Sequence, residues 1–438
     1  MLASSKAATT STQYSHLDDV TFAKTVFAQK MQEQDVADLR VLARVFPFRV
    51  SPYVLSDLIN WDDYQRDPIY RMVFPAREML PHQEFRRLER MLHATMASDS
   101  EIRTEVYRIR AEMNPHPGGQ VELNLPTLDG VRLSGIQHKY RDVILFFPAA
   151  GQTCHTYCPF CFRWAQFVDG NHVKFAEREV SVLLRYLDQQ PLVRDVLFTG
   201  GDPFVMSARM LNRYVKPLLD RKRPQIQVIR FGTKALGYWP YRFFADDDST
   251  ELLELFENIV ASGIQCVIML HNSHARELST GPAREALAQL RGVGVTLRSQ
   301  GAIVRGVNDD SDTWADLWEQ EERESIQPCY AYQVRNTGAH RFFRVSIAKA
   351  FGIMHVARLR VPKNVPTPRA PVMSTSRGKI QIIDVRKVGA DRVVEMKVIR
   401  CPNEEVVGTT FVGRLRDDSG WIDEVEPING VDPSLFSA

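Results

Sequence analysis

The spacing of hydrophobic residues along this 438-residue chain changes near residue 140. Before that point, at 36–44 and 84–96, apolar residues recur every three or four positions, as in a helix with one buried face. After it, short apolar runs alternate with helical patterns. The pattern predicts a mostly helical N-terminal part followed by repeated strand–helix units.

Six apolar runs in the second part have the length of buried strands, and helical patterns separate most of them. The runs are 143–147, 196–199, 227–231, 265–270, 295–298 and 329–334, and the helical patterns are 175–189, 207–219, 250–262 and 283–292. Because no tight turn joins consecutive runs, we expect a parallel sheet with helices outside it. Six units are fewer than the eight of a complete barrel, so the predicted α/β fold is a partial, open (β/α)6 barrel.

The same patterns divide the chain into four segments. Residues 1–15, rich in Ser, Thr and Ala and without an apolar core, are expected to be a disordered leader and not a signal peptide. Residues 16–120 form a helical extension that ends in a linker dense in Pro and Gly, and 121–342 form the barrel. Residues 343–438 hold a helix, a proline-rich passage and an alternating stretch at 380–412 that predicts a small β-rich element.

Composition limits the classes of partner. The chain has 55 Lys and Arg against 53 Asp and Glu, a formal charge of +2, so a nucleic-acid or membrane surface is not indicated. No run of 18 apolar residues occurs, so no membrane span is expected. Sparse cysteines favour a reducing, cytoplasmic location. The charge-dense run 318–324 predicts a solvated helix face without a function.

Three of the six cysteines, Cys154, Cys158 and Cys161, lie within eight residues, directly after the first predicted strand. Three thiolates on one loop can bind three irons of a cubane cluster and leave the fourth iron open. Ordinary ferredoxin sites use four cysteines, and a closed zinc site also needs a fourth ligand. A zinc loop remains the alternative. Cys266, Cys329 and Cys401 are isolated, and two of them lie in apolar, strand-like runs where a buried, inert thiol is expected.

A second motif, Gly200-Gly201-Asp202-Pro203, directly follows the strand predicted at 196–199. By itself it is a turn with a capping aspartate. The cysteine loop and this turn both follow strands of a parallel sheet, so both are expected on the face where such sheets hold their sites.

These two motifs resemble those of the radical SAM enzymes, and from about residue 110 to 375 the chain resembles the lysine 2,3-aminomutase family. The matching stretches are 137–142, the cysteine loop with Arg163 after it, 198–203, 230–234, 271–274, 299–309 and 327–333. The resemblance implies a [4Fe-4S] cluster on the three cysteines whose open iron binds S-adenosylmethionine (SAM). It also implies a flavodoxin- or ferredoxin-type electron donor.

The resemblance further assigns roles around SAM. Gly200, Gly201 and Asp202 are expected to receive the methionine amino group, and Phe160 to lie beside the adenine. His271 and Gln300 are expected near the ribose and the methionyl part.

Two departures from the family pattern concern the substrate and a second cofactor. Family members that move an amino group hold pyridoxal phosphate on a lysine, and Arg369 stands at that position here. A guanidinium stays protonated and forms no imine, so we expect no pyridoxal phosphate unless Lys363 or Lys379 serves instead. Arg335 stands where the family carries an aspartate that holds the ammonium group of lysine, while Arg163 matches the position that binds the amino acid's carboxylate.

The sequence therefore predicts a radical SAM enzyme that reductively cleaves SAM and abstracts hydrogen from a small, anionic substrate, with Arg163 and Arg335 binding that substrate. One alternative is a pyridoxal-phosphate-dependent aminomutase with a displaced lysine. Another is a non-catalytic zinc or iron–sulfur protein. The identity of the substrate and whether the chain forms a homo-oligomer stay open.

Overall fold

The computed structural model describes residues 14–93, 97–114, 123–168, 175–219 and 223–429. The predicted leader and most of the predicted Pro-Gly linker lie outside these residues. None of the described helices is long and apolar enough to cross a membrane.

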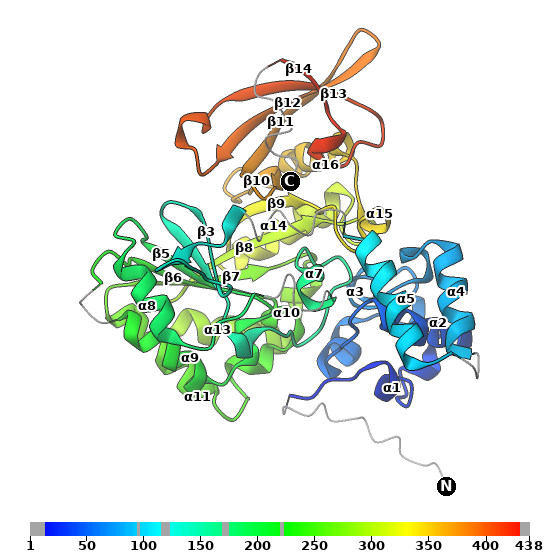
Figure 1. Ribbon diagram of the computed structural model, residues 1–438, viewed down its shortest axis with the longest axis horizontal. Helices are drawn as coiled ribbons and strands as arrows, with labels where there is room; N and C mark the ends of the chain where they lie inside the picture. The colour runs from blue at the N-terminus through cyan, green and yellow to red at the C-terminus, as the bar shows by residue number, and fades with distance from the viewer. Residues whose placement is uncertain (1–13, 94–96, 115–122, 169–174, 220–222, 430–438) are drawn as a thin grey trace.

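Seven described strands pair in parallel and in chain order, β4 next to β5 and so on to β10 (Figure 1). They are β4 (Val143–Phe146), β5 (Asp195–Phe198), β6 (Val228–Thr233), β7 (Gln265–His271), β8 (Thr296–Ile303), β9 (Gln327–Gln333) and β10 (Arg369–Ser374). Six of these are the predicted strands, so the parallel α/β prediction is confirmed. The seventh, β10, was not predicted, because it overlaps the proline-rich passage.

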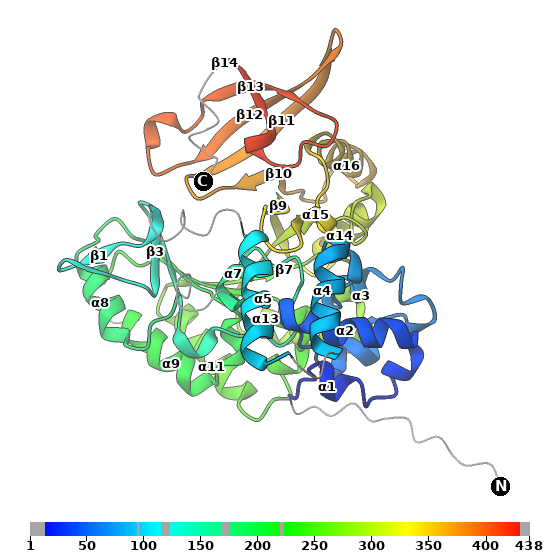
Figure 2. The same ribbon diagram turned by 45° about the vertical axis from the view of Figure 1, so that its right-hand side comes forward.

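Helices connect these strands and cover the outer face of the sheet (Figures 1 and 2). They are α8 (Val180–Asp188), α9 (Ala208–Val215), α10 (Ala235–Tyr238), α11 (Ser249–Ala261), α12 (Arg276–Ser279), α13 (Gly281–Gly292), α14 (Ser311–Arg323) and α16 (Ile347–Arg360). The short helices α7 (Trp164–Val168) and α15 (His340–Phe343) pack instead against the N-terminal helices. Every helix predicted from the sequence in this part therefore has a counterpart.

Alternation along the strands separates an apolar outer face from a polar inner one. In β6, Ile229 and Phe231 are fully buried against the helices, whereas Arg230 between them faces the barrel interior. In β8, Leu297 packs outward and Arg298 inward in the same way. Successive side chains of a strand point to opposite faces, so the apolar residues build the core and the polar ones line a cavity.

The N-terminal helices pack beside the barrel and share a core with the cysteine loop (Figure 2). They are α1 (Asp19–Phe22), α2 (Glu33–Val45), α3 (Pro68–Val73), α4 (His82–His93) and α5 (Asp99–Glu112). Phe160 and Trp164 join the aromatic and aliphatic side chains of these helices in one cluster. The helical extension therefore forms one wall behind the loop.

The C-terminal strands extend the barrel sheet without a break. Strand β11 (Lys379–Val388) pairs antiparallel with β10, followed by β12 (Asp391–Arg400), β13 (Thr410–Leu415) and β14 (Glu426–Asn429). At the other edge, β3 (Ile136–Tyr140) pairs antiparallel with β4, and β1 (Thr127–Leu128) with β2 (Val131–Arg132) forms a separate hairpin. In the described chain β3 and β14 end the sheet, so the barrel is open.

One prediction about α14 is wrong. The charge-dense run was expected to be solvated, but Trp318 and Glu321 are buried. The Glu321 carboxyl accepts a hydrogen bond from Asn272 Nδ2 at 2.8 Å, and burial raises its pKa to about 7. The many charged residues of this run made the whole helix appear exposed, although one of its faces packs against the sheet.

Candidate active site

All eleven residues predicted for the site line one cavity of about 820 Å³ inside the barrel. They are Cys154, Phe160, Cys158, Cys161, Arg163, Gly200, Gly201, Asp202, His271, Gln300 and Arg335. These residues come from loops and strands spread over 180 positions of the sequence. Their convergence follows from the parallel order of the strands.

The cysteine loop connects β4 to α7. Its three cysteines form no disulfide and are partly accessible from the cavity. Burial raises the pKa of all three thiols, that of Cys158 to about 12, so without a bound metal they are protonated at neutral pH. Metal binding would have to displace these protons.

Three cysteines on one loop are the donor set that a [4Fe-4S] cluster with one open iron would take. Among the described residues, no three His, Cys, Asp or Glu side chains gather around a single point as a mononuclear site requires. In a cubane each cysteine ligates a different iron, so the sulfurs need only surround the cluster.

A segment of the N-terminal extension holds the cysteine loop through both side-chain and backbone hydrogen bonds. The Arg49 guanidinium donates to Thr153 Oγ1 at 2.7 Å and to the Cys154 carbonyl at 3.3 Å, and the Arg49 carbonyl accepts from Tyr157 N at 3.0 Å. Ser51 N donates to Thr156 Oγ1 at 3.0 Å. We call residues 49–51 the brace.

The Gly-Gly-Asp turn contacts the same loop. Gly201 N donates to the Gly151 carbonyl at 3.1 Å and Asp202 N to the Thr153 carbonyl at 2.7 Å. A Cβ atom at Gly201 would lie 2.2 Å from the Thr153 carbonyl oxygen, so the close approach requires glycine.

The Asp202 carboxylate bonds to the protein. It accepts from Phe204 N, from Thr233 Oγ1 and from Lys234 N, all within 3.0 Å. It thereby joins the turn after β5 to the end of β6. The resemblance assigned this carboxylate to SAM, whereas the structure shows it bonded to groups of the protein.

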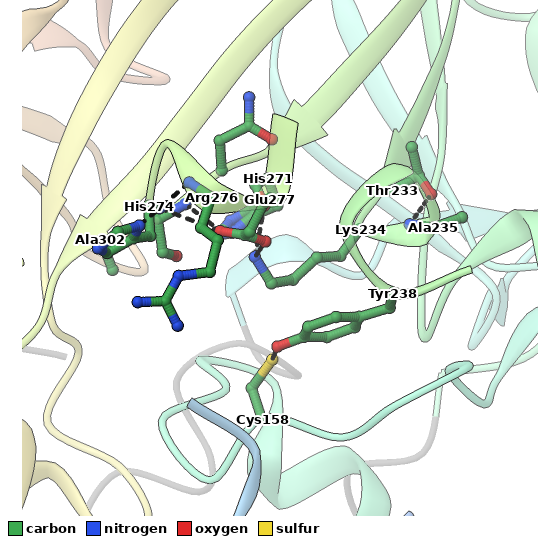
Figure 3. A network of polar contacts seen from close by, with 12 residues as sticks. Cys158, Thr233, Lys234, Ala235, Tyr238, His271, His274, Arg276, Glu277 and Ala302 are labelled. Carbon is green, nitrogen blue, oxygen red and sulfur yellow. Dashed lines mark hydrogen bonds and ion pairs between the residues drawn. The ribbon is translucent and has the colours of Figure 1, made fainter. Parts of the chain in front are cut away.

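A buried ion pair continues these contacts toward β7 (Figure 3). Lys234 Nζ bonds to the Glu277 carboxylate and donates to the His271 carbonyl at 2.8 Å. It lies 4.9 Å from the centre of the Tyr238 ring, and Tyr238 Oη is hydrogen-bonded to Cys158 Sγ at 2.9 Å. Sequence analysis missed Tyr238 and Glu277, which have no motif of their own.

The remaining predicted residues lie around the cavity wall. Phe160 packs edge-on against Phe343, and the His271 ring stacks on Phe162 at 6.2 Å. Burial, followed by the charges of Lys234 and Arg163, lowers the pKa of His271 to about 3, so this imidazole is neutral at physiological pH. Gln300 pairs with His271 across β7 and β8.

Arg163 and Arg335 both face the cavity. Arg163 donates to Thr199 Oγ1 at 3.2 Å and lies over the rings of Phe147 and Phe162. Burial lowers the pKa of each guanidinium to about 10, and each remains charged at neutral pH. Two aspartates in the loop after β8 have other partners: Asp309 pairs with Lys349, and Asp310 caps the N-terminus of α14.

The far end of the cavity, beneath the C-terminal strands, carries residues that sequence analysis did not assign. Arg230, Arg298, Tyr330 and Tyr332 point inward from β6, β8 and β9, with Lys139 and Tyr140 from β3, Lys379 from β11 and Arg400 from β12. Cys329, expected to be inert, also lines this end. The sequence did contain one indication of this cationic end. Arg230 and Arg298 each lie within an otherwise apolar strand, and a strand buried on both faces holds an arginine only where one face lines a cavity.

Comparisons with known proteins agree with the motifs. No family model matches the chain. The chain is 29% identical over 398 residues to a protein of Aquifex aeolicus named "Putative L-lysine 2,3-aminomutase", covering 91% of this chain and 92% of that one. It is 24% identical over 385 residues to the L-lysine 2,3-aminomutase of Methanococcus maripaludis, covering 86% and 76% of the two chains.

Among solved structures, a radical SAM methyltransferase from Sphaerobacter thermophilus matches with a TM-score of 0.34 at 12% identity. That match covers 55% of this chain and 68% of the other. The likeness is too distant to carry an argument about function.

The brace generates a prediction about the cysteine loop. Arg49→Ala removes two hydrogen bonds, each worth about 1 kcal/mol, so the loop should open at least about tenfold more often. Alkylation of Cys154 in the metal-free protein, followed by mass spectrometry of its peptide, should accelerate by about that factor.

Two controls separate loop opening from unfolding. The exposed Arg40→Ala should leave the Cys154 rate unchanged, and Cys266, buried in β7, should stay unreactive in both variants. An unchanged Cys154 rate in Arg49→Ala would show that the brace does not hold the loop.

Proposed function

Because this chain is a lysine 2,3-aminomutase-like enzyme of the radical SAM class, we propose that it abstracts hydrogen from a small anionic substrate bound in the cavity. The observation that carries the proposal is the convergence of the cysteine loop, the Gly-Gly-Asp turn and two arginines on that one cavity. We propose a flavodoxin- or ferredoxin-type protein as the electron donor.

Cys154, Cys158 and Cys161 are the proposed ligands of a [4Fe-4S] cluster, with SAM on the open iron. When bound, the cluster and SAM would supply a 5′-deoxyadenosyl radical able to abstract hydrogen from an unactivated C–H bond. The protein's part is to orient the substrate and exclude water from it. The aromatic wall of Phe160 and Phe162, and the neutral His271, suit the contacts proposed for SAM.

The charge of the cavity supports an anionic substrate. Nine cationic side chains line it against three carboxylates, and two of the carboxylates, Asp142 and Asp195, are already paired with Arg400 and Arg230. A guanidinium can bind a carboxylate through two parallel hydrogen bonds, and Arg163 and Arg335 both line the cavity where such a group would be bound. The proposed substrate carries one anionic or strongly accepting group near each arginine, with the abstracted hydrogen between them.

We propose that pyridoxal phosphate is not a resident cofactor. Arg369 replaces the family's lysine at the first residue of β10. Its guanidinium forms no imine at physiological pH.

A specific observation favours a second candidate, the pyridoxal-phosphate-dependent aminomutase with a displaced lysine. Of the two lysines considered, Lys363 is exposed and outside the cavity lining, whereas Lys379 lines the cavity. Lys379 is therefore the residue that this candidate requires.

The cluster proposal predicts the behaviour of the cysteine variants. After anaerobic reconstitution the protein should hold about four irons and, on reduction, convert SAM to 5′-deoxyadenosine and methionine. Cys154→Ala, Cys158→Ala and Cys161→Ala should each lose both properties, measured by iron analysis and chromatography.

Cys266→Ala, Cys329→Ala and Cys401→Ala are the matched controls and should keep iron and SAM cleavage. Stoichiometric zinc without iron, and no cleavage of SAM, would instead support the non-catalytic binding protein.

The arginine pair predicts the substrate's charge. Small dicarboxylates and organophosphates should raise the melting temperature of the reconstituted protein more than lysine does. Arg335→Asp should weaken their binding at least about tenfold through charge repulsion, while cleavage of SAM without substrate continues. Arg341→Asp, at an exposed arginine nearby in sequence, is the matched control and should bind normally. Equal stabilisation by lysine and by dianions would refute the anionic class.

The absence of resident pyridoxal phosphate is tested on the purified protein. We expect no visible band of lysine-bound pyridoxal phosphate and no release of it by alkali, because Arg369 offers no primary amine. Supplementing the growth medium with pyridoxine should change neither result. One bound equivalent that survives gel filtration would favour the aminomutase.

A further inference from the structure

Tyr238 is a buried tyrosine whose hydroxyl reaches the cysteine loop (Figure 3). It is the last residue of α10, the short helix after β6, and only 1% of it is exposed. Its Oη lies 2.9 Å from Cys158 Sγ, and in the metal-free protein either atom can donate this hydrogen bond. A thiolate that ligates iron has no proton and can only accept. With a cluster bound, Tyr238 must therefore be the donor.

The backbone of Tyr238 is fixed by its neighbours on both sides. Tyr238 N donates to the Lys234 carbonyl at 3.0 Å, and the Tyr238 carbonyl accepts from Ser51 Oγ of the brace at 2.6 Å. Ser51 N in turn donates to Thr156 Oγ1 of the cysteine loop. The brace thus binds the tyrosine and the loop together, so the hydroxyl is held beside Cys158 by more than its own hydrogen bond.

A buried ion pair fixes the ring from the other side. The Lys234 ammonium lies 4.9 Å from the centre of the Tyr238 ring and pairs with the fully buried Glu277. A Cβ atom at Gly237 would lie 2.5 Å from Glu277 Oε2, so glycine is the residue that fits beside this carboxylate. These contacts involve the ring and the backbone of α10, and they remain when the hydroxyl alone is removed.

A hydrogen bond to a ligating sulfur changes how readily a cluster is reduced. Reduction adds one negative charge to the cluster and its thiolates. A donor beside one thiolate therefore stabilises the reduced state more than the oxidised state. The effect is larger for a buried hydroxyl, because the local dielectric constant is low. A hydroxyl at Cys158 would thus raise the reduction potential of a cluster bound there.

We propose that Tyr238 acts through Cys158 as a positioning residue, and that its hydrogen bond to this thiolate raises the reduction potential of the [4Fe-4S] cluster. The inference rests on the proposed function, in which Cys158 is a cluster ligand, and deepens it by naming a residue that favours the first electron transfer. The electron comes from the flavodoxin- or ferredoxin-type donor, which is oxidised as the cluster is reduced. Tyr238 keeps its proton throughout.

The first test compares midpoint potentials. Tyr238→Phe removes the hydroxyl and keeps the ring. Both proteins are reconstituted anaerobically and titrated without SAM, and the electron paramagnetic resonance signal of the reduced cluster is followed. At the wild-type midpoint the ratio of reduced to oxidised cluster should be about tenfold lower in Tyr238→Phe, a shift of about 59 mV to more negative potential for one electron. A midpoint potential does not depend on the amount of cluster, so partial loading leaves the comparison valid.

Tyr53→Phe is the matched control for the loss of a buried hydroxyl. Tyr53 is fully buried in the same apolar cluster as Tyr238, but its hydroxyl is hydrogen-bonded to Thr280 Oγ1 at 2.6 Å and not to a sulfur. This variant should keep the wild-type potential. A shift of the same size and sign in both variants would reflect a general loss of packing and would overturn the inference.

The second test detects the hydroxyl proton in the wild-type protein. After exchange into D2O, electron–nuclear double resonance of the reduced cluster should show a coupled deuteron that Tyr238→Phe lacks. If that variant fails to fold, the wild-type spectrum still decides, because a cluster without any coupled deuteron would contradict the hydrogen bond.

The outcomes separate this inference from the proposed function. Wild type and Tyr238→Phe with four irons and equal midpoint potentials, or a variant with a more positive potential, would overturn the inference alone. Failure of the reconstituted wild type to hold any iron–sulfur cluster would overturn the proposed function, and the inference with it.

Discussion

The hydrogen bonds between the Gly-Gly-Asp turn and the cysteine loop are the contacts on which the rest of the site depends. They exist only because Gly201 lets two backbone segments approach closely. Asp202 then joins this pair of loops to the end of β6, and Lys234 joins β6 to the end of β7. Four neighbouring strand ends are thus tied together by polar contacts. The brace also holds the cysteine loop, so the position of the three thiols is determined by the Gly-Gly-Asp turn of the barrel and by the N-terminal extension.

The parts of the fold that repeat were predictable from the sequence, and so were the residues that belong to short motifs. Six of the seven parallel strands were predictable because the face of each strand that packs against the helices is apolar, and this leaves an apolar run in the sequence. Strand β10 was missed because Pro371 lies within it, and proline ordinarily argues against a strand. Glu321 was misjudged because a charged residue is normally exposed, whereas here Asn272 satisfies it inside the protein.

The cationic end of the cavity could not be predicted because no short motif contains it. Lys139, Arg230, Arg298, Lys379 and Arg400 are contributed by five strands, and only the order of the sheet brings them together. Their charges are costly to bury, and two of them are compensated by Asp142 and Asp195. The other three, Lys139, Arg298 and Lys379, give this end of the cavity a cationic lining.

Because β9, β10 and β11 are neighbours in one sheet, residues that are well separated in the sequence lie close together there. Arg369 and Lys379 are ten residues apart, yet Arg369 pairs with Tyr330 across β10 and β9, and the amine of Lys379 lies over the ring of the same tyrosine. A side chain supplied from either strand can therefore reach the same compartment. The cavity therefore receives a primary amine from β11 beside the guanidinium that β10 contributes, although the two residues belong to different strands.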